Sequence, residues 1–136
     1  CEVSYENVIV PVENRLGKEG AGFKIAMKAL DAGRIGIAAQ AVGIAQGALN
    51  EAVKFVKERK QFGKRISSFQ NTQFKIADLQ TNIDAARLMT YRAALTKDEG
   101  GNYGPDAAMA KLFASKMAND VCRDCVQLMG GYGYCR

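Results

Sequence analysis

The chain has 136 residues, with 19 lysines and arginines against 14 aspartates and glutamates, so its formal net charge is +5. Its 48% hydrophobic and 24% charged residues are typical of a folded domain rather than a disordered segment. Histidine is absent, which excludes Ser-His-Asp and Cys-His catalysis and histidine-ligated metal sites. No apolar run approaches the ~20 residues that cross a bilayer, so the sequence predicts no membrane span.

Both ends of the sequence indicate a piece of a longer polypeptide. The chain begins with Cys1 rather than methionine and lacks the apolar segment of a signal peptide. It stops at Arg136, shortly after a glycine-rich stretch, with no further element to close the fold. We therefore expect segments on both sides of it in the whole protein.

Residues 1–16 predict a β-strand, because β-branched residues alternate there with polar ones, although Pro11 interrupts the run. A strand needs hydrogen-bonding partners, and no second strand follows in the sequence. We therefore expect residues 1–18 to be the terminal strand and linker of an upstream β-domain. Residues 19–136 then form a helical bundle domain that is incomplete at its C-terminal end.

The rest of the chain predicts three long helices, over residues 21–60, 70–97 and 105–129. Apolar or small residues recur in each at spacings of three and four, and Pro105 suits the first turn of the third helix. The first helix would be about 55 Å long at 1.5 Å per residue. The expected inward-facing residues are Phe23, Met27, Leu30, Arg34, Ile37, Ala41, Ile44, Ala48, Ala52 and Val56 on the first helix, Phe74, Ala77, Ile83, Ala86, Met89 and Ala93 on the second, and Ala108, Leu112, Ser115, Ala118 and Cys122 on the third.

The connections between these helices are short, which makes neighbouring helices antiparallel. The predicted fold class is therefore all-α: an antiparallel up-down helical bundle with three long helices of a four-helix-type domain, preceded by one β-strand. The middle of the first helix is apolar on nearly every side, which is typical of a helix buried among others. Three such helices need a fourth helix or a partner subunit to cover them.

Cys122 and Cys125 form a C-x-x-C pattern within the third predicted helix. A redox dithiol, or a zinc site completed by Cys135, would use such a pattern. The flanking residues are apolar, however, and the sequence contains no second ligand pair. We therefore favour buried structural thiols over a redox or metal site.

A basic segment, residues 57–68, lies between the first two helices, with Phe62 and Gly63 among its lysines and arginines. Three interpretations remain open. The basic side chains could simply be solvent-exposed residues at a helix C-terminus, where the helix dipole favours positive charge. They could bind a nucleotide, with an arginine on its phosphates and an aromatic ring on its base. They could also bind nucleic acid.

Two further segments contain residue types that line ligand sites. The glycines at the end of residues 127–131 would let a ligand approach the backbone closely, or would simply cap the third helix. Asp31 and Arg34 stand three apart on the first helix, so they could pair with each other or line a pocket. No general base can be assigned, because Arg34 would keep Asp31 ionised.

Taken in order and spacing, four segments resemble the C-terminal part of the acyl-CoA dehydrogenase family. The stretch Val8-Ile-Val-Pro-Val-Glu-Asn14, with Leu16-Gly17 and Gly20-Ala-Gly-Phe23, resembles the exit from the family's middle β-domain. The stretch Leu30-Asp-Ala-Gly-Arg-Ile-Gly-Ile37 resembles the start of its first bundle helix. The stretch Glu58-Arg-Lys-Gln-Phe-Gly63, followed by Phe69-Gln70, resembles the first of the family's two flavin segments. The stretch Gln127-Leu-Met-Gly-Gly-Tyr-Gly133 resembles the second. The resemblance covers essentially the whole chain and is closest to the short-chain (butyryl-CoA) branch.

The resemblance implies an FAD-dependent enzyme that introduces an α,β double bond into short-chain acyl-CoA thioesters and passes electrons to an electron-transferring flavoprotein. It implies a homo-oligomer built as a dimer of dimers, in the bacterial cytoplasm or the mitochondrial matrix, without a nucleic-acid partner. The implied contacts to the FAD of a neighbouring subunit are Arg59, Phe62, Gln70, Gln127, Leu128, Met129, Gly130 and Gly131. The implied acyl-CoA contacts are Asp31, Ala32, Gly33 and Arg34.

The chain ends before the position at which most of this family carries its catalytic glutamate. Branches that place the glutamate on the first bundle helix would have it where this chain has Gly33. We therefore assign no catalytic residue and no metal ligand, and we expect the chain alone to be inert and to self-associate. The alternative function is a non-catalytic interaction or scaffold module with the same fold.

Overall fold

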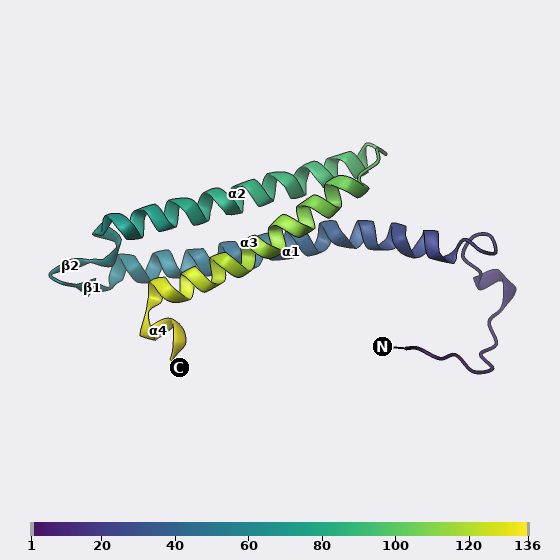
Figure 1. The fold of residues 1–136 in the computed structure, drawn as a ribbon, viewed down its shortest axis with the longest axis horizontal. Helices are drawn as coiled ribbons and strands as arrows, with labels where there is room; N and C mark the ends of the chain where they lie inside the picture. The colour runs from purple at the N-terminus through teal and green to yellow at the C-terminus, as the bar shows by residue number, and fades with distance from the viewer. Residues whose placement is uncertain (1, 136) are drawn as a thin grey trace.

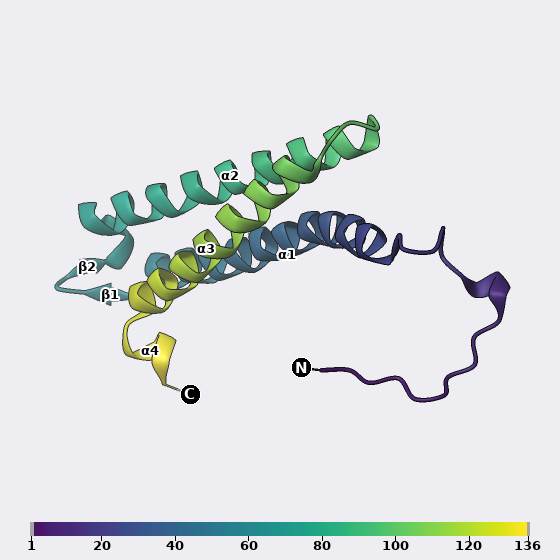
Figure 2. The same cartoon turned by 45° about the vertical axis from the view of Figure 1, so that its right-hand side comes forward.

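The computed structural model describes residues 2–135 and is dominated by three long helices, α1 (Gly22–Glu58), α2 (Gln70–Asp98) and α3 (Gly104–Met129). Successive helices run antiparallel, and α3 returns along α1 (Figures 1 and 2). This confirms the predicted all-α bundle, and each helix boundary lies within two residues of its prediction. The shorter elements are the 3₁₀-helices η1 (Val12–Asn14) and η2 (Ile66–Ser68), the strands β1 (Lys60–Gln61) and β2 (Lys64–Arg65), and helix α4 (Gly131–Tyr134).

A small β-hairpin joins α1 to α2, where the sequence suggested only a basic break. The strands β1 and β2 are antiparallel, with Lys60 opposite Arg65 and Gln61 opposite Lys64. The tip residues Phe62 and Gly63 both have positive φ, 54° and 76°, as a two-residue turn of this kind requires. Gly63 therefore forms the hairpin turn and does not end α1, which stops five residues earlier at Glu58.

Small side chains make up much of the core. Alanines are completely buried on all three helices, which lets the helix backbones approach one another closely. Larger residues fill the spaces between them, and Leu49, Val56, Ile83 and Val121 are the largest fully buried side chains. Helix α3 packs chiefly on α1, and the buried residues form one continuous cluster across the three helices.

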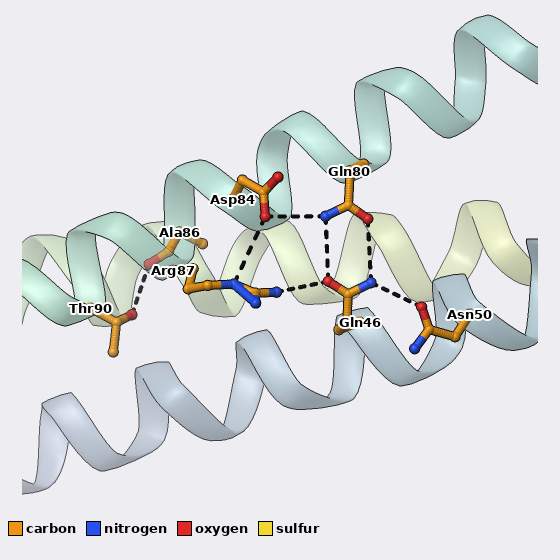
Figure 3. Close-up of polar contacts among 7 residues, drawn as sticks. All are labelled: Gln46, Asn50, Gln80, Asp84, Ala86, Arg87 and Thr90. Carbon is orange, nitrogen blue, oxygen red and sulfur yellow. Dashed lines mark hydrogen bonds and ion pairs between the residues drawn. The ribbon is translucent and has the colours of Figure 1, made fainter.

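A polar network crosses the seam between α1 and α2 (Figure 3). Gln46 is its centre: its Oε1 accepts a 2.7 Å hydrogen bond from Arg87 Nη2, and its Nε2 donates to Asn50 Oδ1 at 3.0 Å. Gln46 and Gln80 also exchange longer amide hydrogen bonds of 3.3 and 3.4 Å. Gln80 then donates to Asp84, which lies 3.8 Å from Arg87 Nε. These hydrogen bonds link α1 to α2 and fix how the two helices are aligned along their contact.

The structure of this chain alone assigns no strand to residues 2–16, and a strand paired with an upstream β-domain stays a prediction. Residues 2–11 pair with no other segment that the structure describes, and residues 12–14 form the turn of η1. In both views this segment loops out beyond the start of α1 and turns back below the bundle, apart from the helices (Figures 1 and 2). A strand exists only through hydrogen bonds to a neighbour, and the described chain offers none there.

The predicted inward faces are partly wrong. On α3 the prediction is one residue out of phase, because the buried residues are Ala107, Ala110, Ala114, Met117, Val121 and Cys125. One residue turns a helix face by about 100°. On α1, Phe23, Met27, Leu30, Ile37 and Ile44 are exposed, and on α2 so are Phe74 and Ala77. Both faces of these helices are small or apolar, so periodicity alone could not select the buried one.

The faces of α1 and α3 that the sequence predicted to be buried instead line a groove of about 320 Å³ on the outside of the core. Its walls include Ile37 and Ile44 from α1, and Ser115, Ala118 and Cys122 from α3. The bundle thus presents an apolar face to solvent. Among residues 2–135, no helix is long and apolar enough to cross a membrane.

Candidate functional site

A cleft of about 550 Å³ lies at the end of the bundle where α1 stops and α3 ends, near the hairpin (Figure 1). Segments far apart in the sequence meet there, because α1 and α3 run antiparallel to α2 and finish at the same end. The lining residues are Phe55, Arg59, Gln61, Ile66, Gln127, Leu128, Met129, Gly130, Gly131, Tyr132 and Cys135. The fold therefore brings Arg59 together with the whole of residues 127–131.

Arg59 is held by its backbone at the junction of α1 and the hairpin. Its N–H donates to Phe55 O at 2.9 Å, and its carbonyl accepts from Ile66 N–H at 2.9 Å. Its guanidinium carbon lies 5.3 Å from the centre of the Tyr132 ring. Five other arginines of residues 2–135 form ion pairs with carboxylates, but Arg59 and Arg65 form none there. The cleft thus contains an uncompensated positive charge beside an aromatic ring.

Three glycines shape the other wall of the cleft, for different reasons. Gly130 ends α3 with φ of 58°, a backbone conformation that favours glycine. Gly133 allows α4 to fold back on α3, because a Cβ there would lie 2.6 Å from Val126 O. At Gly131, in contrast, a Cβ would meet no atom within 4 Å. Gly130 and Gly131 are therefore both left with open space at their Cβ positions, whereas Gly133 is not.

Two of the predicted flavin contacts lie outside this cleft. Phe62 is 90% exposed at the hairpin tip, where its ring meets Phe69 edge-on with 6.4 Å between centroids. The Lys64 ammonium covers the Phe69 ring at 4.2 Å. Gln70 is an exposed residue at the start of α2. A ligand in the cleft would reach these residues only by extending beyond it.

Sequence reasoning missed other members of the lining, chiefly Phe55, Ile66 and Tyr132. The signal for Tyr132 was its place directly after the glycine pair. Phe55 lies one helical turn before Arg59 and therefore shares its face of α1. Nothing in the sequence pointed to Ile66, because its place depends on the hairpin.

The predicted acyl-CoA segment, residues 31–34, lies near the other end of α1. Asp31 and Arg34 form an ion pair along the helix, which is the structural alternative considered above. Asp31 Oδ2 would lie 3.5 Å from a Cβ placed on Gly104, so the carboxylate also faces the start of α3. Ala32 is half-buried, and Gly33 is exposed with open space around its Cβ position. At 1.5 Å per residue, Arg34 and Arg59 are about 37 Å apart along the helix.

Cys125 is buried in the core, and Cys122 is half-buried beside the outer groove. The pKa of the Cys125 thiol is raised to about 11, chiefly by burial and in addition by the neighbouring Cys122 and Asp124. A thiol with so high a pKa carries little thiolate and is chemically inert at neutral pH. Between residues 2 and 135 no cluster of cysteine and carboxylate side chains could hold a metal ion.

Comparisons with known proteins agree with the fold. The family model for the C-terminal domain of acyl-CoA dehydrogenase matches residues 20–136. The short-chain specific acyl-CoA dehydrogenase of Clostridium acetobutylicum is 56% identical over 133 residues, which cover 98% of this chain and 35% of that protein. The caffeyl-CoA reductase-Etf complex subunit CarC of Acetobacterium woodii is 53% identical over 133 residues, with the same coverage.

Among solved structures, butyryl-CoA dehydrogenase from Megasphaera elsdenii is 53% identical to this chain. Its match has a TM-score of 0.94 and covers 96% of this chain and 34% of that one. This chain therefore spans about a third of the length of these relatives. It belongs to the acyl-CoA dehydrogenase family, as a C-terminal helical domain similar to those of the short-chain members.

Proposed function

We propose that this chain is the C-terminal helical part of a flavin-dependent acyl-CoA dehydrogenase for short-chain acyl-CoA thioesters, and that its cleft forms one side of an FAD site. The observation that carries the proposal is the meeting of Arg59 with residues 127–131 in one cleft. The relatives that share this sequence are themselves named as short-chain acyl-CoA dehydrogenases. The electrons would leave to an electron-transferring flavoprotein, in line with the relative named as a subunit of an Etf complex.

The residues of the cleft fit a dinucleotide with a pyrophosphate. Arg59 has no carboxylate partner among the described residues, and a guanidinium binds phosphate oxygens with two parallel hydrogen bonds. The open space at Gly131 leaves its backbone accessible to a ligand. Leu128 and Met129 are half-buried against the core and supply an apolar wall, while the exposed Gln127 supplies an amide. Phe62 and Gln70 would contact the part of the ligand that leaves the cleft.

FAD, when bound, would accept the hydride that leaves the β-carbon of the thioester. Residues 31–34 supply no base for the α-proton, because Asp31 is paired with Arg34 and residue 33 is glycine. A carboxylate from outside this chain would then remove that proton. Residues 31–34 would line the acyl-CoA side, and residues 127–131 with Arg59 would hold the cofactor of a neighbouring subunit in a dimer of dimers. The compartment would be the bacterial cytoplasm or the mitochondrial matrix.

A hybrid enzyme tests this function. In it, this chain replaces the matching segment of the Clostridium acetobutylicum relative, with which it is 56% identical. We expect the hybrid to bind FAD and butyryl-CoA to bleach its flavin absorbance. The Arg59→Gln variant should weaken FAD binding by roughly 10–100-fold, since charge-assisted hydrogen bonds contribute ~1.5–3 kcal/mol. Lys60→Gln is the matched control, because it removes the neighbouring charge outside the cleft.

The outcomes separate the parts of the proposal. A folded hybrid without flavin would contradict the FAD site and favour the scaffold alternative, for which the exposed apolar groove between α1 and α3 is the supporting observation. Equal FAD affinity in the Arg59→Gln and Lys60→Gln variants would show that Arg59 does not bind FAD. A hybrid that holds FAD but is not reduced by butyryl-CoA would refute the substrate class.

A further inference from the structure

The aromatic pair formed by Phe55 and Tyr132 is the least explained part of the cleft. Their ring centroids are 5.7 Å apart with 47° between the ring planes. The guanidinium of Arg59 lies over the same Tyr132 ring at 5.3 Å. Phe55 and Arg59 are one turn apart on α1, so Tyr132 from α4 covers the last turn of that helix. The Tyr132 ring thus contacts both the Phe55 ring and the Arg59 guanidinium.

The backbone around Tyr132 is constrained in a way that fixes this contact. Gly130 provides the left-handed residue that turns the chain after α3. Gly133 lets α4 fold against Val126, at a distance that no other residue type would permit. Tyr132 lies between these two glycines, so its ring is directed back toward α1. The neighbouring Tyr134 is 88% exposed and is not part of the cleft lining.

An arginine at a helix end without a carboxylate partner would otherwise sample many rotamers, and ordering it would weaken the binding of its ligand. A ring face restricts the guanidinium by a cation–π contact and leaves its N–H groups free to donate. Such a contact does not neutralise the charge, unlike an ion pair. A ring is therefore better suited than a carboxylate to holding an arginine ready for an anion.

We propose that Tyr132 is a positioning residue, which holds the guanidinium of Arg59 in the orientation that receives the phosphates of the cofactor. The proposal rests on the function proposed above. It adds the residue that determines how tightly Arg59 binds the phosphates of the cofactor. The ring is the required feature, and the hydroxyl of Tyr132 is not.

Three variants in the hybrid enzyme test the proposal through the dissociation constant of FAD. Tyr132→Leu removes the ring and should raise this constant about 2–5-fold, the range of a cation–π contact at an exposed site, because 65% of Tyr132 is exposed. Tyr132→Phe keeps the ring and should restore the constant to within about twofold of the unsubstituted hybrid. Tyr134→Leu is the matched control on the same short helix and should have no effect. The KM for butyryl-CoA should not change in any of them once FAD is saturating.

A second measurement needs no ligand. In the NMR spectrum of this chain, the ring current of Tyr132 should shift the side-chain protons of Arg59 upfield. Tyr132→Leu should abolish that shift, and Tyr132→Phe should retain it. This readout reports the contact itself and does not depend on cofactor binding.

Unchanged FAD affinity in Tyr132→Leu would overturn the proposal, and so would a Tyr132→Phe variant as weak as Tyr132→Leu. If Arg59→Gln weakens FAD binding and Tyr132→Leu does not, Arg59 remains a cofactor contact and the positioning role alone fails. If neither variant changes FAD affinity, the FAD contact of Arg59 fails, and the positioning role fails with it.

Discussion

Replacing Gln46 by leucine should destabilise the bundle through the polar network that joins α1 to α2 (Figure 3). The substitution keeps the size of the side chain and a good helix former, so it removes the hydrogen bonds without changing the helix. Arg87 loses the hydrogen bond from its Nη2 to Gln46, and its Nε is already buried without a hydrogen-bond partner within residues 2–135. After the change, the guanidinium retains only Asp84 at 3.8 Å.

The expected loss follows from these contacts. A hydrogen bond to a charged group contributes ~1.5–3 kcal/mol, and the lower end applies because 34% of the Arg87 side chain is exposed. The long amide bonds to Gln80 add about 0.5 kcal/mol, and the exposed Asn50 adds little. Leucine recovers about 0.5 kcal/mol by partial burial. The free energy of unfolding should therefore fall by about 1–2 kcal/mol, and Tm by roughly 3–8 °C.

Chemical and thermal unfolding, followed by circular dichroism at low protein concentration, measure this change. Gln40→Leu is the matched control, because Gln40 lies on the same helix, is exposed and makes no side-chain hydrogen bond within the described chain. The double variant of Gln46→Leu with Arg87→Leu should recover part of the loss, with a coupling energy of about 1 kcal/mol. A Gln46→Leu variant as stable as the Gln40→Leu variant, or a coupling energy near zero, would refute the reasoning.

Further measurements address the cleft, the core thiol and the exposed face. Gly133→Ala should abolish the ring-current shift of Arg59, and the global stability should stay nearly unchanged because α4 has no buried residue. Gly131→Ala is the control and should retain the shift. A retained shift in both variants would show that the close contact between Gly133 and Val126 does not position Tyr132. Iodoacetamide at pH 8 should modify Cys135 far faster than Cys125, whose pKa is raised to about 11. Because the pKa of Cys125 is higher in the folded than in the unfolded chain, the protonated thiol contributes stability below about pH 9, and this contribution is lost as the pH rises through 11. A Cys125→Ala variant that loses the same stability at alkaline pH would contradict this prediction. The chain with added FAD should not oxidise butyryl-CoA, and turnover at an enzymatic rate would show that it does contain a base. Light scattering at ~100 μM should give a mass above that of one chain, because the apolar groove is of a kind rarely left bare; a monomer would count against an interface there.

The long helices could be predicted from sequence because small or apolar residues recur at spacings of three and four along each, and because Pro105 and Gly130 mark the two ends of α3. The face that each helix buries could not. On α3, Ala107 and Ala108 differ by one position and have the same side chain, so only the packing against α1 decides which is buried. The strand predicted at the start of the chain likewise depends on a packing partner, and it stays a prediction. Its β-branched residues indicate an extended backbone, but a strand also needs a neighbour.

The candidate site was predictable where local chemistry signalled it. Arg59 and the glycine pair stand out as a basic helix end and a glycine-rich turn, and the antiparallel fold brings them into one cleft. Ile66 could not be predicted, because its position depends on the hairpin that forms where the sequence shows only a basic break. The sequence revealed a glycine-rich turn but not the separate reasons for its glycines. Only the backbone geometry distinguishes Gly130, which needs positive φ, from Gly133, which needs space beside Val126.

The hairpin between α1 and α2 has a consequence for how the two walls of the cleft are connected. Its tip is exposed at Phe62, and it contributes no buried residue to the core that α1 shares with α3. A single cut by a protease at that tip would leave Arg59 on one peptide and residues 127–131 on another. The packing of α1 on α3 would still hold the two peptides together. The hairpin tip is thus not needed to hold α1 against α3, and the two peptides should stay associated after the cut, with the cleft residue Gln61 on one and Ile66 on the other.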